Sequence, residues 1–205
     1  MGGGKSSSWG GGGGGSAPPL STADLISQRE GKTTEVDQVL SVLRDVNNQY
    51  GVQIDTEVGI FPAGSSVMGY HDPNTGNLGM SKSYFDSAKL DGVMDEQAKI
   101  GYHPSRGDKS GIEAVMSHEA GHKLNYVASD KAGMSADALA NKVVSSASKS
   151  LGYKNSANMA SKISGYATES MKECIAEAFA DVYCNGNNAR KESKAVVSEL
   201  NKYFP

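Results

Sequence analysis

Apolar residues recur every three or four positions along several stretches of the chain, which is the spacing that places them on one face of an α-helix. In the first half this pattern runs from Thr34 to Tyr50, and the following Gly51 can end a helix. The second half shows the same pattern repeatedly. Helices are expected there from Ser110 onward and over residues 135–151, 156–163, 168–184 and 190–203. We therefore expect the second half of the chain to be helical.

The part of the chain after Gly51 has a different pattern, in which apolar and polar residues partly alternate as they do in β-strands. It predicts short strands over residues 52–61, 67–70 and 78–80. The last two should form a hairpin, because Pro73 fixes φ early in the turn and Gly76 can adopt a positive φ. Residues 85–109 show only weak periodicity, and we expect a loop over residues 101–108 before the next helix.

The length of 205 residues fits a single domain with a real core. The first 19 residues are nearly all Gly, Ser and Pro, and such a segment buries too little apolar surface to repay the entropy of ordering. We therefore divide the chain into a flexible tail over residues 1–19 and one domain over residues 20–205.

The charges of the chain are nearly balanced, with 20 Lys and Arg residues against 23 Asp and Glu residues. Because no basic run is interleaved with aromatic residues, nucleic acid is not expected as a partner. No apolar run approaches the ~20 residues that span a bilayer, and the N-terminus lacks the apolar core of a secretory signal. We expect a soluble protein, and the sequence leaves its route of delivery and its oligomeric state open.

The pattern His-Glu-x-x-His occurs at His118, Glu119 and His122. On a helix, residues four apart lie on one face, so the two histidines can bind one metal ion while the glutamate reaches a water molecule beside it. Ser110 and Glu113 have the spacing of a capping box, which predicts where this helix starts. The pattern therefore has the helical setting that a zinc hydrolase needs.

A third ligand is needed, because a catalytic zinc site usually has three protein ligands and an open position for water. The two remaining histidines, His71 and His103, are isolated in the sequence and are expected to be loop or surface residues. Glu173, Glu177 and Asp181 are better candidates. They are spaced four apart, so their carboxylates share one face of a helix whose other residues are largely apolar or small. The sequence favours a carboxylate as the third ligand.

These residues, taken with Tyr166, resemble a known family. The sequence HEAGH at residues 118–122, Tyr166, and ECIAEAF at residues 173–179 are similar to the catalytic domain of anthrax lethal factor and its relatives, which include the Pro-Pro endopeptidases. In that family a tyrosine stands seven residues before the liganding glutamate and a second glutamate stands four residues after it, and both spacings occur here. The resemblance covers roughly residues 50–205. It implies an α+β, zincin-like fold with a small mixed sheet, an active-site helix and a helical C-terminal half.

The resemblance also implies a zinc-dependent endopeptidase and assigns its ligands. His118, His122 and Glu173 would bind zinc, although two imidazoles and a carboxylate also suit other transition metals. Glu119 would act as the general base that takes a proton from water and passes it to the leaving amine. The implied substrate is a peptide or protein, and its sequence is left open.

Two further residues have roles that the resemblance implies. Tyr166 would donate a hydrogen bond to the oxyanion that develops on the carbonyl, and Glu177 would orient one of the histidines. Asp181 has no assigned role, and we expect it to be a capping or surface group. An alternative assignment, on the pattern of thermolysin-like enzymes, makes Glu177 the third ligand and Asp181 its supporter.

A different interpretation of the whole chain is a phage- or mobile-element-associated structural or interaction protein, with a metal site that is inactive or serves only stability. Relatives of the domain occur in such proteins, which leaves virion association and export by a non-classical route open. Glu119 favours the enzyme, because a purely structural zinc site does not need an acid beside its first histidine. The tripeptide Arg106-Gly107-Asp108 matches an integrin-binding motif, but such short matches are common in polar loops.

Overall fold

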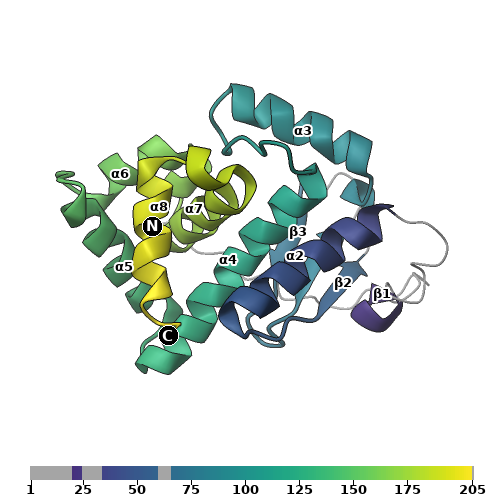
Figure 1. Cartoon of the computed structure of the whole chain (residues 1–205), viewed down its shortest axis with the longest axis horizontal. Helices are drawn as coiled ribbons and strands as arrows, with labels where there is room; N and C mark the ends of the chain where they lie inside the picture. The colour runs from purple at the N-terminus through teal and green to yellow at the C-terminus, as the bar shows by residue number, and fades with distance from the viewer. Residues whose placement is uncertain (1–19, 25–33, 60–65, 205) are drawn as a thin grey trace.

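The structure is a computed structural model that describes residues 20–24, 34–59 and 66–204 (Figure 1). The flexible tail expected over residues 1–19, and the end of the strand expected over residues 52–61, lie outside these ranges. Within them the chain has a mixed α+β fold that is mostly helical, as the sequence predicted. No helix in these ranges is long and apolar enough to cross a membrane.

The helices predicted from the apolar spacing are present in the described residues, with small differences at their ends. They are α2 (Thr34–Tyr50), α4 (Gly111–Ala132), α5 (Ala136–Ser150), α6 (Ser156–Ile163), α7 (Met171–Asn185) and α8 (Lys191–Asn201). Helix α7 starts later than predicted, because Ser170 caps it by accepting a hydrogen bond from the backbone N–H of Glu173. The residues Tyr166–Thr168 form a separate 3₁₀ turn, η3.

Among the described residues, the sequence did not predict helix α3 (Ser87–Lys99). Only Leu90 and Met94 of this helix are buried, so its apolar face is narrow and its periodicity is weak. Asp86 does mark its start, since the side chain accepts a hydrogen bond from a backbone N–H in the first turn. The weakly patterned part of the sequence is therefore partly helical, and the expected loop follows this helix.

Four strands of the described chain form one small mixed sheet in the order β1-β2-β4-β3. They are β1 (Leu20–Ser21), β2 (Thr56–Gly59), β3 (Gly69–His71) and β4 (Leu78–Ser81). Strands β3 and β4 form the predicted antiparallel hairpin, and Gly76 in its turn has a φ of 75°. Strand β2 starts later than predicted and runs parallel to β4, with Val58 opposite Met80. Strand β1, which was not predicted, pairs with β2 in the antiparallel direction.

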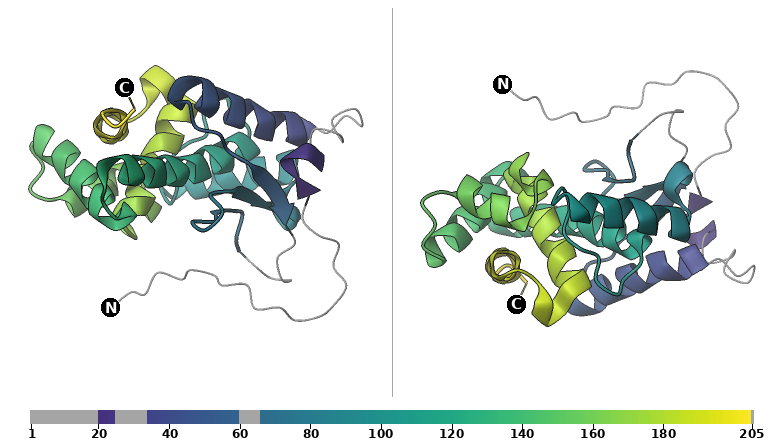
Figure 2. Two further views of the ribbon diagram at one scale, coloured as in Figure 1. Left: turned by 90° about the horizontal axis from the view of Figure 1, so that it is seen from below. Right: turned by 90° about the horizontal axis from the view of Figure 1, so that it is seen from above.

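Helix α4 lies between the two halves of the fold (Figure 1). The sheet, α2 and α3 lie on one side of it, and α5 to α8 are gathered on the other, as the turned views in Figure 2 also show. Buried apolar side chains from both halves form one cluster. It includes Val39 of α2, Met80 of β4, Leu124 of α4, Ile175 of α7 and Leu200 of α8. Helices α4 and α7 are therefore anchored in a common core.

Gly121 allows α4 and α7 to approach each other closely. A Cβ atom added at this position would lie 2.8 Å from Cα of Ala176 and 3.1 Å from Cβ of Phe179. A larger residue at this position would therefore push the two helices apart. This close approach places the first turn of α7, which carries Glu173, beside the His-Glu-x-x-His residues of α4.

Candidate metal centre

The start of α4 is fixed by the predicted capping box. Ser110 Oγ accepts a hydrogen bond from the backbone N–H of Glu113 at 3.2 Å, and Glu113 Oε2 accepts one from the backbone N–H of Ser110 at 2.9 Å. Asp91 of α3 accepts a further bond from the backbone N–H of Gly111, at 2.6 Å. These bonds satisfy N–H groups that a helix start leaves without partners. They fix the N-terminal end of the helix that carries both candidate histidines.

The structure brings the three predicted ligands together. One ligand atom from each of His118, His122 and Glu173 lies within 4.8 Å of the other two. Glu173 Oε2 is 3.1 Å from Nε2 of His118 and 3.2 Å from Nε2 of His122. Among the described residues, no other group of three or more His, Cys, Asp or Glu side chains is arranged in this way.

These separations suit an ion of the size of zinc. Two ligand atoms that each lie ~2.1 Å from a tetrahedral ion are ~3.4 Å apart, which is close to the spacing seen here. Glu173 Oε2 is buried and has no hydrogen-bond partner, although both Nε2 atoms lie close to it. A cation at the point that the three atoms share would satisfy this oxygen. Burial opposes the ionisation of Glu173, but His118 and His122 lower its pKa well below its usual value.

Glu177 contacts His118 from the other edge of the ring. Its Oε1 lies 2.8 Å from Nδ1 of His118, and its Oε2 accepts a hydrogen bond from Ser164 Oγ at 2.7 Å. An ionised carboxylate can only accept, so Nδ1 carries a hydrogen, and in the neutral ring Nε2 keeps a lone pair that can bind a metal. Burial favours a lower pKa for His118, but Glu173 and Glu177 raise it well above its usual value. The predicted position of Glu177 behind a histidine is therefore the one that it occupies.

Glu119 borders a cavity next to His118, one of the candidate ligands. Its side chain is only 7% exposed, and the volume of this cavity is about 310 Å³. Strand β3 passes close by, since a Cβ atom added to Gly69 would lie 3.1 Å from the Glu119 side chain. Burial raises the pKa of Glu119, and the two candidate ligand histidines act in the opposite direction.

Tyr166 is held over the same site by the 3₁₀ turn η3. Its ring is stacked on that of His118, with centroids 5.7 Å apart and an interplanar angle of 28°. Burial raises the pKa of Tyr166, and so do the nearby carboxylates of Glu173 and Glu119. Its hydroxyl therefore keeps its proton and is available as a donor, and its side chain borders the cavity.

The two isolated histidines differ from the expectation of loop or surface residues. His103 does lie in a loop, but it is only 7% exposed, and its Nδ1 is 2.9 Å from Glu177 Oε1. His71 ends strand β3 and is partly buried, with its ring 4.8 Å from that of Tyr126. Burial lowers the pKa of His71 to about 4, and the charges of His122 and Lys123 act in the same direction. His103 is thus a residue of the site that the sequence did not predict.

Asp181 does not contribute to the ligand cluster, and it is not a surface group. It is 1% exposed and accepts hydrogen bonds from the backbone N–H of Arg190 at 3.0 Å and from Ser193 Oγ at 2.6 Å. Since Arg190 precedes α8, Asp181 is a capping group, but a buried one. The alternative assignment is not favoured, because Glu177 faces Nδ1 of His118 and Asp181 supports α8 instead.

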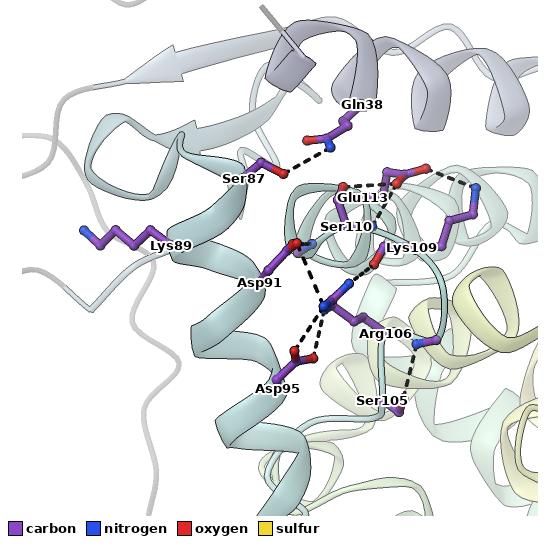
Figure 3. A network of polar contacts seen from close by, with 12 residues as sticks. Gln38, Ser87, Lys89, Asp91, Asp95, Ser105, Arg106, Lys109, Ser110 and Glu113 are labelled. Atoms are coloured by element: carbon purple, nitrogen blue, oxygen red, sulfur yellow. Dashed lines mark hydrogen bonds and ion pairs between the residues drawn. The ribbon is translucent and has the colours of Figure 1, made fainter.

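The loop that carries His103 is tied to α3 through Arg106 (Figure 3). The Nε and Nη2 atoms of Arg106 donate to the two carboxylate oxygens of Asp95, at 2.9 and 3.0 Å, and Nη1 donates to the backbone carbonyl of Lys109. Such a bidentate pair holds the guanidinium group in one orientation. The arginine of the Arg106-Gly107-Asp108 tripeptide is therefore engaged within the fold, which argues against an integrin-binding role.

The residues around the candidate centre thus come from four parts of the fold. Helix α4 supplies two candidate ligands and Glu119, α7 supplies Glu173 and Glu177, and two connecting segments supply His103 and Tyr166. Comparison of the chain with protein-family models, with curated proteins and with solved structures finds no match.

Proposed function

We propose that this chain is a zinc-dependent endopeptidase with a zincin-like fold, similar to the lethal factor catalytic domain and the Pro-Pro endopeptidases. One observation carries the proposal. The buried, unpartnered Oε2 of Glu173 lies between the Nε2 atoms of His118 and His122, and Glu119 borders the adjoining cavity. Three ligands with a neighbouring carboxylate form the donor set of a hydrolytic metal site.

A zinc ion bound to these three side chains would polarise the scissile carbonyl and lower the pKa of a water molecule toward ~7. The remaining steps fall to side chains of this chain. Glu119 takes the proton of the attacking water and passes it to the leaving amine. Tyr166 donates a hydrogen bond to the carbonyl oxygen as negative charge develops on it. Glu177 keeps the ring of His118 in the tautomer and orientation that a ligand needs.

An extended peptide fits the surroundings of the site. In the described sheet β3 stands at the end of the strand order, and Gly69 at its start lies beside Glu119. A peptide that aligns its backbone with a strand at the edge of a sheet is bound mainly through main-chain hydrogen bonds. A substrate placed in this way along β3 would pass the carboxylate of Glu119, which suits cleavage within a chain.

The test combines metal analysis with digestion of a peptide library. We expect the purified protein to bind one equivalent of zinc and to cleave peptides, and removal of the metal to stop cleavage. Glu119→Ala should retain zinc and lose cleavage by a factor of at least ~10³, because the proton acceptor is gone. The control is Glu169→Ala at an exposed position outside the site, which should cleave as the wild type does.

Two outcomes would contradict this proposal or part of it. Cleavage that survives in Glu119→Ala would rule out the proposed general base and the peptidase mechanism with it. Retention of the metal in Glu173→Gln would instead support the alternative in which Glu177 is the third ligand.

A further inference from the structure

His103 is a buried imidazole at the candidate site, and the steps proposed above do not use it. It lies in the loop between α3 and α4 and borders the same cavity as Glu119 and Tyr166. Burial of an imidazole costs free energy unless its polar atoms have partners. A buried histidine in the wall of this cavity is therefore expected to make hydrogen bonds with the protein or with a ligand.

Glu177 fixes the orientation of this ring. Nδ1 of His103 lies 2.9 Å from Glu177 Oε1, which is the same oxygen that bonds Nδ1 of His118. Because an ionised carboxylate can only accept, each Nδ1 carries a hydrogen. In the neutral ring, Nε2 of His103 is then a lone-pair acceptor on the edge that points away from Glu177.

The backbone around His103 is also held in place. Two backbone hydrogen bonds, of 2.8 and 2.9 Å, tie residues 101–102 to residues 165–166. The ring centroid of His103 consequently lies 5.1 Å from that of Tyr166 and 6.4 Å from that of His118. The imidazole is therefore held beside Tyr166 and His118, as expected of a binding group whose position is fixed before the substrate arrives.

We propose that His103 is a further substrate-binding residue, whose Nε2 accepts a hydrogen bond from a backbone N–H of the peptide in the cavity. This inference rests on the proposed peptidase function, since it concerns the same cavity. If His103 only held Glu177 in place, Nδ1 alone would be required and Nε2 would make no functional contact. The experiment therefore has to separate the two nitrogens.

Two substitutions achieve this separation. In His103→Asn the amide NH₂ can take the place of Nδ1 and keep the bond to Glu177, but no atom reaches the place of Nε2. In His103→Gln the longer side chain carries its amide to the place of Nε2 and gives up the contact with Glu177. Both variants are loaded with zinc and assayed with the peptide that the wild type cleaves best in the library digest.

We expect His103→Asn to bind one equivalent of zinc as the wild type does and to lose about 10- to 100-fold in kcat/KM. His103→Gln should retain more activity than His103→Asn. A second measurement avoids turnover: in zinc-loaded protein made inactive by Glu119→Gln, the added His103→Asn change should weaken calorimetric binding of the same peptide about 10-fold.

His103→Asn with the kcat/KM and peptide affinity of the wild type would overturn the inference and leave the peptidase function intact. Loss of zinc from His103→Asn would overturn it too, because His103 would then act through the metal site. If His103→Asn does not fold, His103→Gln decides: more activity than His103→Ala supports the role of Nε2, and equal activity contradicts it. A wild-type protein that binds zinc and cleaves no peptide would instead refute the proposed function, and the inference would fall with it.

Discussion

Glu177 Oε1 lies 2.8 Å from Nδ1 of His118, on the edge of the ring opposite the nitrogen that faces Glu173. Burial disfavours a charge on Glu177, but hydrogen bonds with His103 and His118 hold its pKa below its usual value. A carboxylate in this position fixes the direction of a ligand ring and makes the ring a better donor to a metal. Metal affinity should therefore depend on Glu177, even though this residue is not one of the three ligands.

Glu177→Gln should weaken zinc binding by about 10- to 100-fold. The substitution keeps the shape of the side chain, but it replaces an ionised acceptor with a neutral amide that cannot accept equally well from two imidazoles. Competition against a chromogenic zinc chelator measures the affinity. Glu169→Gln, at an exposed position before α7, is the matched control and should bind zinc as the wild type does. Equal affinities in the two variants would contradict the supporting role of Glu177.

Tyr166→Phe should lower kcat by about 10²-fold and leave the zinc content and KM close to those of the wild type. The stacked ring would remain on His118, and only the hydroxyl that donates to the developing oxyanion would be lost. Steady-state kinetics on the best library peptide measure this. Tyr102→Phe removes a hydroxyl from the neighbouring ring, 5.5 Å away, and should retain most of the activity. An unchanged kcat in Tyr166→Phe would show that another donor faces the oxyanion.

Asp181→Asn should destabilise the fold and leave the zinc content unchanged. The Asp181 carboxylate accepts hydrogen bonds from the backbone N–H of Arg190 and from Ser193 Oγ, and an amide NH₂ in its place could not accept them. We therefore expect a loss of ~1–3 kcal/mol in the free energy of unfolding. Urea denaturation and metal analysis on the same samples measure both effects. Asp130→Asn, at an exposed position in α4, should change stability by less than ~0.5 kcal/mol. Loss of zinc from Asp181→Asn at unchanged stability would revive the assignment of Glu177 as the ligand.

Local spacing in the sequence was enough to predict the parts of the site that lie on helices. His118 and His122 are four residues apart on α4, and Glu173 and Glu177 are four apart on α7, so each pair shares a helix face wherever the helix is placed. The capping box of Ser110 predicted the start of α4 for the same reason, because its bonds join residues three apart. The family resemblance added the expectation that both helices meet at one metal.

Features that depend on contacts between distant segments could not be predicted in this way. His103 bonds Glu177 across 74 positions of the chain, and no periodicity of its own loop indicates this partner. Strand β1 is defined only by its pairing with β2, since two residues carry no pattern. Helix α3 has too few buried positions for a clear period, although the capping residue Asp86 was a usable signal.

The close approach of α4 and α7 at Gly121 makes a prediction that links packing to the metal site. Gly121→Ala would place a Cβ atom 2.8 Å from the backbone of Ala176, so α7 must move away from α4. Overpacking of this kind costs ~1–3 kcal/mol, which should exceed the gain of ~1 kcal/mol from replacing a helical glycine with alanine. Because Glu173 moves with α7, zinc affinity should fall by about 10-fold as well.

Gly92→Ala provides the matched control, because Gly92 also lies inside a helix and has no atom within 4 Å of an added Cβ. This variant should gain up to ~1 kcal/mol in stability and bind zinc as the wild type does, since only the helix propensity changes. Urea denaturation and zinc competition on both variants therefore separate propensity from packing. If alanine changed stability and zinc affinity in the same direction at both glycines, the close packing of α4 against α7 would not be what positions Glu173 beside His118 and His122.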